Sequence, residues 1–163
     1  MVAITAEMKR LVNRQRLAFV GTHSADGWPH ISPKGSLRWW DGDRMVWADA
    51  DFGDTVSNLS VDPRTVIVVV DPFARRGYRF RGVSTVVRTG RLFAKALRLY
   101  EQEGSDSRRI QCIVFTRVGQ ITPLVSPAYA HGYDEVLLER LWEEYHTRTF
   151  DKMVVDLIPP PEF

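Results

Sequence analysis

The chain has 163 residues, of which 44% are hydrophobic and 26% charged, and its net charge is +2. This composition is that of an ordinary globular protein, so we expect one domain over residues 1–163, with a proline-rich tail at 157–163. The 22 basic and 20 acidic residues balance too closely to require nucleic acid or an anionic membrane. Neither partner is therefore expected.

Cysteine usage and hydropathy point to a cytoplasmic protein. Cys112 is the single cysteine, which excludes an intramolecular disulfide, and it lies in an apolar run typical of a core strand. No apolar run approaches the roughly 20 residues that span a bilayer. The first eleven residues mix Glu7, Lys9 and Arg10 into an amphipathic pattern unlike a signal peptide. We expect a reducing, cytoplasmic setting.

The first half of the chain alternates β-rich runs with turn signals. In chain order, we expect a helix from Thr5 to about Asn13, strands at 17–22, 29–40 and 44–50, and a short helix at 55–59. The Asp26-Gly27 pair is a strong hairpin signal between the first two strands. Asp54 is expected to cap the short helix, and Pro63 to end it.

The second half contains the longest β-rich runs. We expect strands at 65–71, 76–90 and 108–121, and helices at 92–104 and about 134–146. The run TVIVVVD at 65–71 is β-branched and apolar on both faces, which predicts a central strand buried on both sides. Six strands in meander order with peripheral helices predict a mainly β protein, built as a six-stranded antiparallel barrel.

The second strand has one wholly polar face. Period-two alternation places His30, Ser32, Lys34, Ser36 and Arg38 on one side, and Ile31, Pro33, Gly35 and Leu37 on the other. One interpretation is a solvent-washed face of an edge strand, which Pro33 favours because an edge strand can spare an N–H group. The other is a ligand-facing strand, with Lys34 as a cation and Gly35 allowing close backbone approach.

Three acids, Asp49, Asp51 and Asp54, crowd the turn in WADADFGDTVSNLSVDP (47–63). A calcium loop does not fit, because the glycine comes one place early and the twelfth position is Ser60 instead of glutamate. We expect no metal here. The remaining interpretations are a helix cap with solvated acids, or an anion site at the helix N-terminus that uses Thr55 and Asn58.

Three ordered segments carry a resemblance to a known family: PHISPKGSL, then WDGDRMVWADADFGDTVSNLSVDPRTVIVVVD, then RRGYRFRGVSTVV. Together with SPAYAHG (126–132), they resemble the flavin-binding split-barrel proteins related to pyridoxamine 5′-phosphate oxidase, over roughly residues 10–147. The resemblance implies a split β-barrel homodimer with FMN in clefts at the subunit interface. It also implies an FMN-dependent oxidoreductase that acts on a small-molecule substrate or electron donor.

The family's cofactor contacts can be carried over by position. The resemblance implies cofactor binding by Ser32, Pro33, Lys34, Gly35, Ala48, Asp49, Thr55, Asn58 and Arg79. The family's phosphate loop carries Ser-Arg-Lys, whereas this chain has Gly53-Asp54-Thr55. Phosphate would therefore need Thr55, Asn58, helix N-terminal amides and an arginine from elsewhere, with Arg79 preferred over Arg75, Arg76 and Arg81.

Two other functions within the same fold stay open. One is a non-catalytic flavin-binding or electron-transfer protein. The other is a split-barrel protein that binds a deazaflavin or haem, as other branches of the superfamily do. Pyridoxamine 5′-phosphate oxidase activity itself is not expected, because the C-terminal sequence DLIPPPEF lacks the family's Arg-x-His type motif. No Ser-His-Asp or Cys-His arrangement suggests a nucleophilic enzyme.

Overall fold

The computed structural model describes residues 3–50 and 53–157, with side chains as far as Phe150. The helices are α1 (Ala6–Gln15), α2 (Asp54–Val61), α3 (Gly90–Gln102) and α4 (Glu135–Leu157), with short 3₁₀ turns η1 (Ser107–Arg109) and η2 (Pro127–His131). The strands are β1 (Ala18–His23), β2 (Pro29–Lys34), β3 (Arg38–Asp41), β4 (Arg44–Asp49), β5 (Arg64–Asp71), β6 (Arg76–Val87) and β7 (Cys112–Val125).

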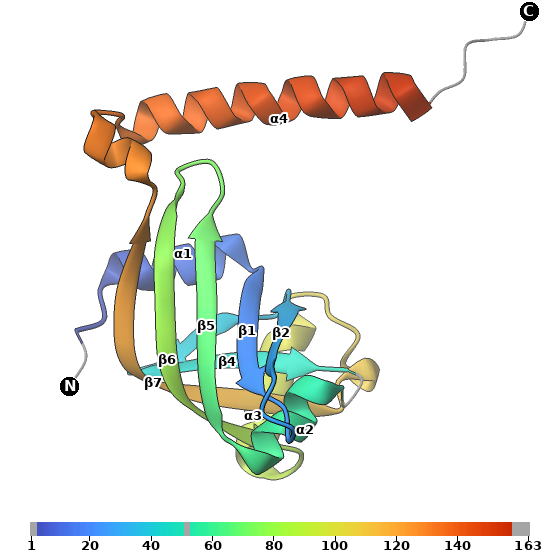
Figure 1. Ribbon diagram of the computed structural model, residues 1–163. Helices are drawn as coiled ribbons and strands as arrows, with labels where there is room; N and C mark the ends of the chain where they lie inside the picture. The colour runs from blue at the N-terminus through green and yellow to red at the C-terminus, as the bar shows by residue number, and fades with distance from the viewer. Residues whose placement is uncertain (1–2, 51–52, 158–163) are drawn as a thin grey trace, which may run out of the picture. The chain divides into compact units, whose positions relative to one another are not determined.

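These strands form one sheet in the order β2-β1-β5-β6-β7-β4-β3. The sheet curves so that β4 passes behind β5 and β6 (Figure 1). It is mainly antiparallel and remains open, because β2 and β3 are its two edges. The expected mainly β split barrel is confirmed, and the position of β2 at an edge agrees with Pro33 in that strand.

The prediction of six strands is wrong by one, because the expected strand at 29–40 is broken in two. Gly35 and Ser36 form a turn, after which β3 pairs with β4. The Ser36 hydroxyl accepts from the Ala48 N–H at 2.9 Å and donates to the Ala48 carbonyl at 3.0 Å. This hydroxyl takes the place of a ladder partner and directs the chain toward the opposite edge of the sheet.

The core lies inside the curved sheet. It is built from alternate strand residues, including Val20, Trp39, Trp47, Ile67 and Phe80, all of which are buried. A second cluster joins α3 to the outer side of β4 and β7 through Ala96, Tyr100, Val46, Ile113 and Phe115.

Strand β5 is central, as predicted, but it is not buried on both faces. Ile67 and Val69 point into the core, whereas Val66 and Val68 are half-buried and Val70 is exposed. The apolar outer face of β5 is left uncovered in the single chain.

Two helix starts test the predicted caps. The Thr5 side chain accepts from the Met8 N–H at 3.2 Å, so the predicted cap of α1 is confirmed. The cap of α2 is Gly53 and makes no side-chain hydrogen bond, so the prediction that Asp54 caps this helix is wrong. Asp54 is instead the first helical residue, where a carboxylate still complements the helix dipole.

Two glycines of β6 permit close approach of neighbouring strands. A Cβ atom at Gly77 would overlap the Val69 carbonyl oxygen, and one at Gly82 would overlap the Arg117 carbonyl oxygen. Both positions therefore require glycine for steric reasons.

The chain divides into two compact units, 1–70 with 77–124, and 71–76 with 125–163. The first holds the sheet core and α1 to α3. In the second, the Tyr129 hydroxyl donates to the Ala74 carbonyl at 2.6 Å, and the Arg75 guanidinium lies 4.1 Å from the Trp142 ring centroid. Helix α4 runs eleven residues beyond the predicted end at 146. Whether the units form one domain stays a prediction.

Candidate functional site

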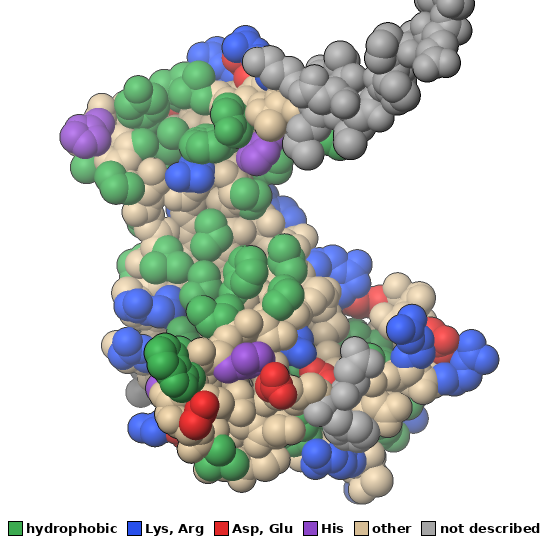
Figure 2. All heavy atoms as spheres, turned by 45° about the vertical axis from the view of Figure 1, so that its right-hand side comes forward, with side chains coloured by type: hydrophobic (Ala, Val, Ile, Leu, Met, Phe, Trp, Pro, Cys, Tyr) green, Lys and Arg blue, Asp and Glu red, His purple; other side chains and the backbone are tan. Residues whose placement is uncertain are grey.

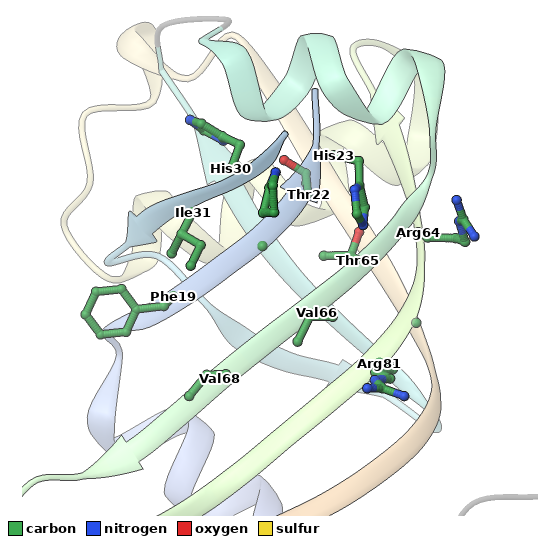
Figure 3. Close-up of a pocket in the computed structure, with 13 residues that line it drawn as sticks. Phe19, Thr22, His23, His30, Ile31, Arg64, Thr65, Val66, Val68 and Arg81 are labelled. Atoms are coloured by element: carbon green, nitrogen blue, oxygen red, sulfur yellow. The ribbon is translucent and has the colours of Figure 1, made fainter. Parts of the chain in front are cut away.

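A groove of about 590 Å³ lies over the outer face of β1, β2, β5 and β6. Its lining residues are Phe19, Gly21, Thr22, His23, Pro29, His30, Ile31, Arg64, Thr65, Val66, Val68, Arg81 and Gly82. Figure 3 shows Phe19 and Ile31 at one end and Arg64 and Arg81 at the other, with Val66 between them. The groove therefore has an apolar floor and a basic end.

Strand register explains why the surface is hollow at this point. Gly21 of β1 lies opposite Ile31 of β2 on one side and opposite Val66 of β5 on the other. Because Gly21 has no side chain, the outer surface of the sheet is recessed between the side chains of Ile31 and Val66. A Cβ atom here would meet the Val66 carbonyl oxygen at 3.5 Å and the Val66 Cβ at 3.8 Å, which are ordinary contacts. Glycine is thus needed for the depth of the groove, and not for the fold.

The basic end carries one arginine without an acidic partner. Arg64 forms a bidentate ion pair with Asp62, and these hydrogen bonds lower the pKa of Asp62 to about 2. Arg81 makes no ion pair within the described chain, and its guanidinium donates to the Gln120 side chain at 3.4 Å. Arg81 is therefore the groove's best candidate for binding an anion.

Two histidines border the groove near α2. His30 Nε2 lies 4.0 Å from the Asp54 carboxylate, and His30 Nδ1 is buried without a hydrogen-bond partner among the described residues. His23, at the end of β1, is exposed. A neutral imidazole with a free ring nitrogen can accept a hydrogen bond or ligate a metal centre.

Lys34, the cation predicted on β2, lies outside the groove and contacts β4. Lys34 Nζ lies 2.6 Å from Asp49 Oδ2 and 5.0 Å from the Trp47 ring centroid. The Asp49 side chain is 4% exposed and that of Lys34 is 15% exposed. The structure thus brings together two predicted site residues, but it does so as a buried ion pair.

The other predicted residues lie around this pair or on α2. Ser32 is half-buried on the same face of β2 as Lys34, Pro33 is exposed on the opposite face, and Gly35 and Ala48 flank the Ser36 bridge. Whether any of them binds a cofactor stays a prediction.

Helix α2 holds its predicted phosphate ligands inward. Thr55 and Asn58 are both buried, and Asn58 Nδ2 donates to the Thr22 hydroxyl at 3.1 Å. Asp54, by contrast, is largely exposed. Arg79 is half-buried, and its Nε atom has no hydrogen-bond partner in the part of the chain that the structure describes. None of the nine predicted cofactor ligands lines the groove.

Sequence reasoning considered His30, Ile31 and Arg81, but it missed the apolar residues of the groove because their pattern is that of an ordinary strand. Phe19, Val66 and Val68 are apolar residues in apolar runs, so no polar motif marks them. A sequence signal does exist at Gly21, since an isolated glycine inside a strand often indicates close approach of a ligand or another backbone.

Metal binding has no support in the described residues. No three His, Cys, Asp or Glu side chains gather there as a metal site requires. Asp51, one of the three crowded acids, lies outside the described residues. Cys112 is buried, and burial, followed by the nearby Asp49 carboxylate, raises the pKa of its thiol to about 11. The described part of the chain contains no helix long and apolar enough to cross a membrane.

Comparison with known proteins identifies the family. The model of the pyridoxamine 5′-phosphate oxidase family matches residues 4–121. The chain therefore belongs to this family. No curated protein sequence matches it significantly.

Solved structures share the fold. HupZ of Group A Streptococcus is 31% identical, with a TM-score of 0.69 over 76% of this chain and 96% of that chain. An FMN-binding protein from Syntrophomonas wolfei is 16% identical, with a TM-score of 0.60 over 73% of this chain and 84% of that chain. HutZ, the heme storage protein from Vibrio cholerae, is 19% identical, with a TM-score of 0.60 over 76% of this chain and 95% of that chain. The last two show likeness of fold alone.

Proposed function

We propose that this protein is a cytoplasmic FMN-binding oxidoreductase that takes electrons from, or passes them to, a small molecule. The observation that carries the proposal is the groove, because its apolar floor ends at the guanidinium of Arg81, which has no acidic partner among the described residues. Membership of the pyridoxamine 5′-phosphate oxidase family supports it.

The residues of the groove fit FMN in size and chemistry. A volume of about 590 Å³ falls within the roughly 300–1,000 Å³ of typical small-molecule sites. The aromatic ring system would lie against Ile31, Val66 and Val68, and the phosphate dianion would meet Arg81. The N-terminus of α2 fits less well, because the exposed Asp54 carboxylate would repel a phosphate there.

Bound FMN would supply the electron-transfer chemistry, and this chain's residues would position it. Phe19 and Ile31 would cover one end of the bound ring system, while His23 offers a hydrogen-bonding group toward the other end. The charge of Lys34 is compensated by Asp49, so we expect this ion pair to change the cofactor's potential little.

A second copy of the chain would close the groove. Phe19 is 50% exposed and Ile31 67% exposed, and the outer valines of β5 continue the same apolar area. Figure 2 shows hydrophobic side chains gathered on this face. Since monomers rarely leave large contiguous apolar patches in water, we propose that this face forms the homodimer interface. Sedimentation at micromolar concentration should show a dimer, and Ile31→Glu should shift it toward monomer.

Haem is the second candidate ligand, and one observation favours it. His23 and His30 both line the groove, and the buried Nδ1 atom of His30 has no hydrogen-bond partner within residues 3–50 and 53–150. Histidine is a common axial ligand of haem iron, and the groove's arginines could bind the propionates.

The visible spectrum of the purified protein separates these candidates. Flavin bands would support the proposal, a Soret band would support haem, and failure to bind either group on reconstitution would refute both.

Titration with FMN and riboflavin then locates the phosphate. Arg81→Gln should weaken FMN binding about tenfold or more and leave riboflavin binding unchanged, because a hydrogen bond to a charged group contributes about 1.5–3 kcal/mol. Equal weakening of both ligands would place the phosphate elsewhere. The variant Lys34→Gln, measured on protein that circular dichroism shows to be folded, tests the alternative position on β2.

A further inference from the structure

A second hollow lies on the same sheet, farther along β6. It has a volume of about 330 Å³, with Val83 and Val87 from β6, Leu92 from α3 and Phe115 from β7 forming an apolar floor. Arg44 of β4 and Arg117 of β7 stand at its rim. None of these residues borders the groove proposed for FMN.

The two arginines are direct cross-strand partners. Strands β4 and β7 are antiparallel, and Arg44 pairs with Arg117 in their register. Like charges in this position repel, so the pair destabilises the sheet unless something neutralises it. Asp41 neutralises Arg44 through hydrogen bonds of 2.7 and 2.5 Å, and it raises the pKa of that guanidinium. Arg117 forms no ion pair or side-chain hydrogen bond with any described residue.

Further basic residues lie beside the hollow, on α3. Leu92 lines both this hollow and the neighbouring exposed face of α3, which carries Arg91, Lys95 and Arg98. Lys95 lies 5.1 Å from the Trp40 ring centroid, and its charge also acts on Asp41. Asp41 occupies the Arg44 guanidinium, so an anion in the hollow would meet Arg117.

We propose that this hollow binds an organic monoanion with an apolar body. The anionic group lies against Arg117, and the body lies on Val83, Val87, Leu92 and Phe115. A liquid water molecule takes about 30 Å³, and a methylene group is of similar size, so 330 Å³ holds about eleven non-hydrogen atoms. A medium-chain carboxylate such as octanoate has this size. The inference is independent of the proposed flavin function.

Calorimetric titration with octanoate tests the charge contact. Wild-type protein should bind octanoate, and Arg117→Gln should weaken that binding about tenfold. Arg10→Gln, which removes the same charge from α1 outside the hollow, should leave it unchanged. Binding of the neutral 1-octanol should not respond to either variant. Absence of octanoate binding at millimolar concentration, or equal weakening in both arginine variants, would overturn the proposal.

Val83→Glu tests the position of the apolar body. Val83 is 52% exposed, so the fold should tolerate a carboxylate there, which circular dichroism would check. Repulsion in the hollow should weaken octanoate binding about tenfold. Octanoate binding that is lost in Arg81→Gln but kept in Val83→Glu would place the anion in the flavin groove and refute the assignment.

Discussion

Gly21→Val should fill the groove and leave the fold intact. Gly21 lies at the centre of the groove, between Ile31 and Val66, and its missing side chain makes the floor deep. A Cβ atom here would make only ordinary contacts, of 3.5 and 3.8 Å, with Val66. Because valine suits a strand better than glycine, we expect the free energy of unfolding to stay unchanged or rise by up to about 1 kcal/mol.

The loss of ligand binding can be estimated from the volume removed. Valine adds three carbon atoms, which occupy about 90 Å³ at roughly 30 Å³ each. This is about one sixth of the 590 Å³ groove, and it is taken from the middle, where a flat ring would lie. Forcing atoms into an occupied space costs about 1–3 kcal/mol, so FMN binding should weaken about 5- to 150-fold.

The assay is a titration of FMN followed by quenching of flavin fluorescence, with thermal unfolding measured on the same samples. Gly35→Val is the matched control, because Gly35 also has open space around it but lies outside the groove. A folded Gly21→Val protein that binds FMN as tightly as wild type would refute the groove as the cofactor site. Weakening by Gly35→Val alone would place the cofactor beside the polar face of β2.

Three further predictions concern stability. Lys34→Gln removes the ammonium group that lies 2.6 Å from the buried Asp49 carboxylate. The free energy of unfolding, measured in denaturant, should therefore fall by about 3 kcal/mol. Adding Asp49→Asn should restore most of that loss. Gly82→Ala should destabilise by about 3 kcal/mol because its Cβ overlaps the Arg117 carbonyl, whereas an equally stable Gly82→Ala protein would contradict the close strand approach. The pKa of Asp62 is lowered from 3.8 to about 2 by Arg64, so wild type should exceed Asp62→Asn in stability above about pH 4 and lose that advantage as the pH falls toward 2. Acid unfolding of both proteins checks the sign, and a constant difference down to pH 2 would count against the pair.

Local chemistry in the sequence determined most of the elements. Asp26-Gly27 predicted the β1–β2 hairpin, and Gly27 does adopt a left-handed φ of 85°. Thr5 predicted the start of α1, and period-two alternation identified which residues of β2 share a face. These features depend on neighbours within a few residues, so they can be read without the fold.

Only the tertiary structure decided which faces meet. Val66 and Val68 are β-branched apolar residues like the buried Ile67 and Val69. Nothing in the sequence therefore indicates that the face of β5 with Val66 and Val68 is less buried than the other. Lys34 was correctly placed on a polar face, yet its charge is compensated by Asp49, which β4 brings beside it. The groove is lined by residues of four strands that are far apart in the sequence, from Phe19 of β1 to Arg81 of β6. Alternation fixes the residues that share a face, but long-range strand pairing selects the partner of each face, and that pairing is not encoded in any single segment.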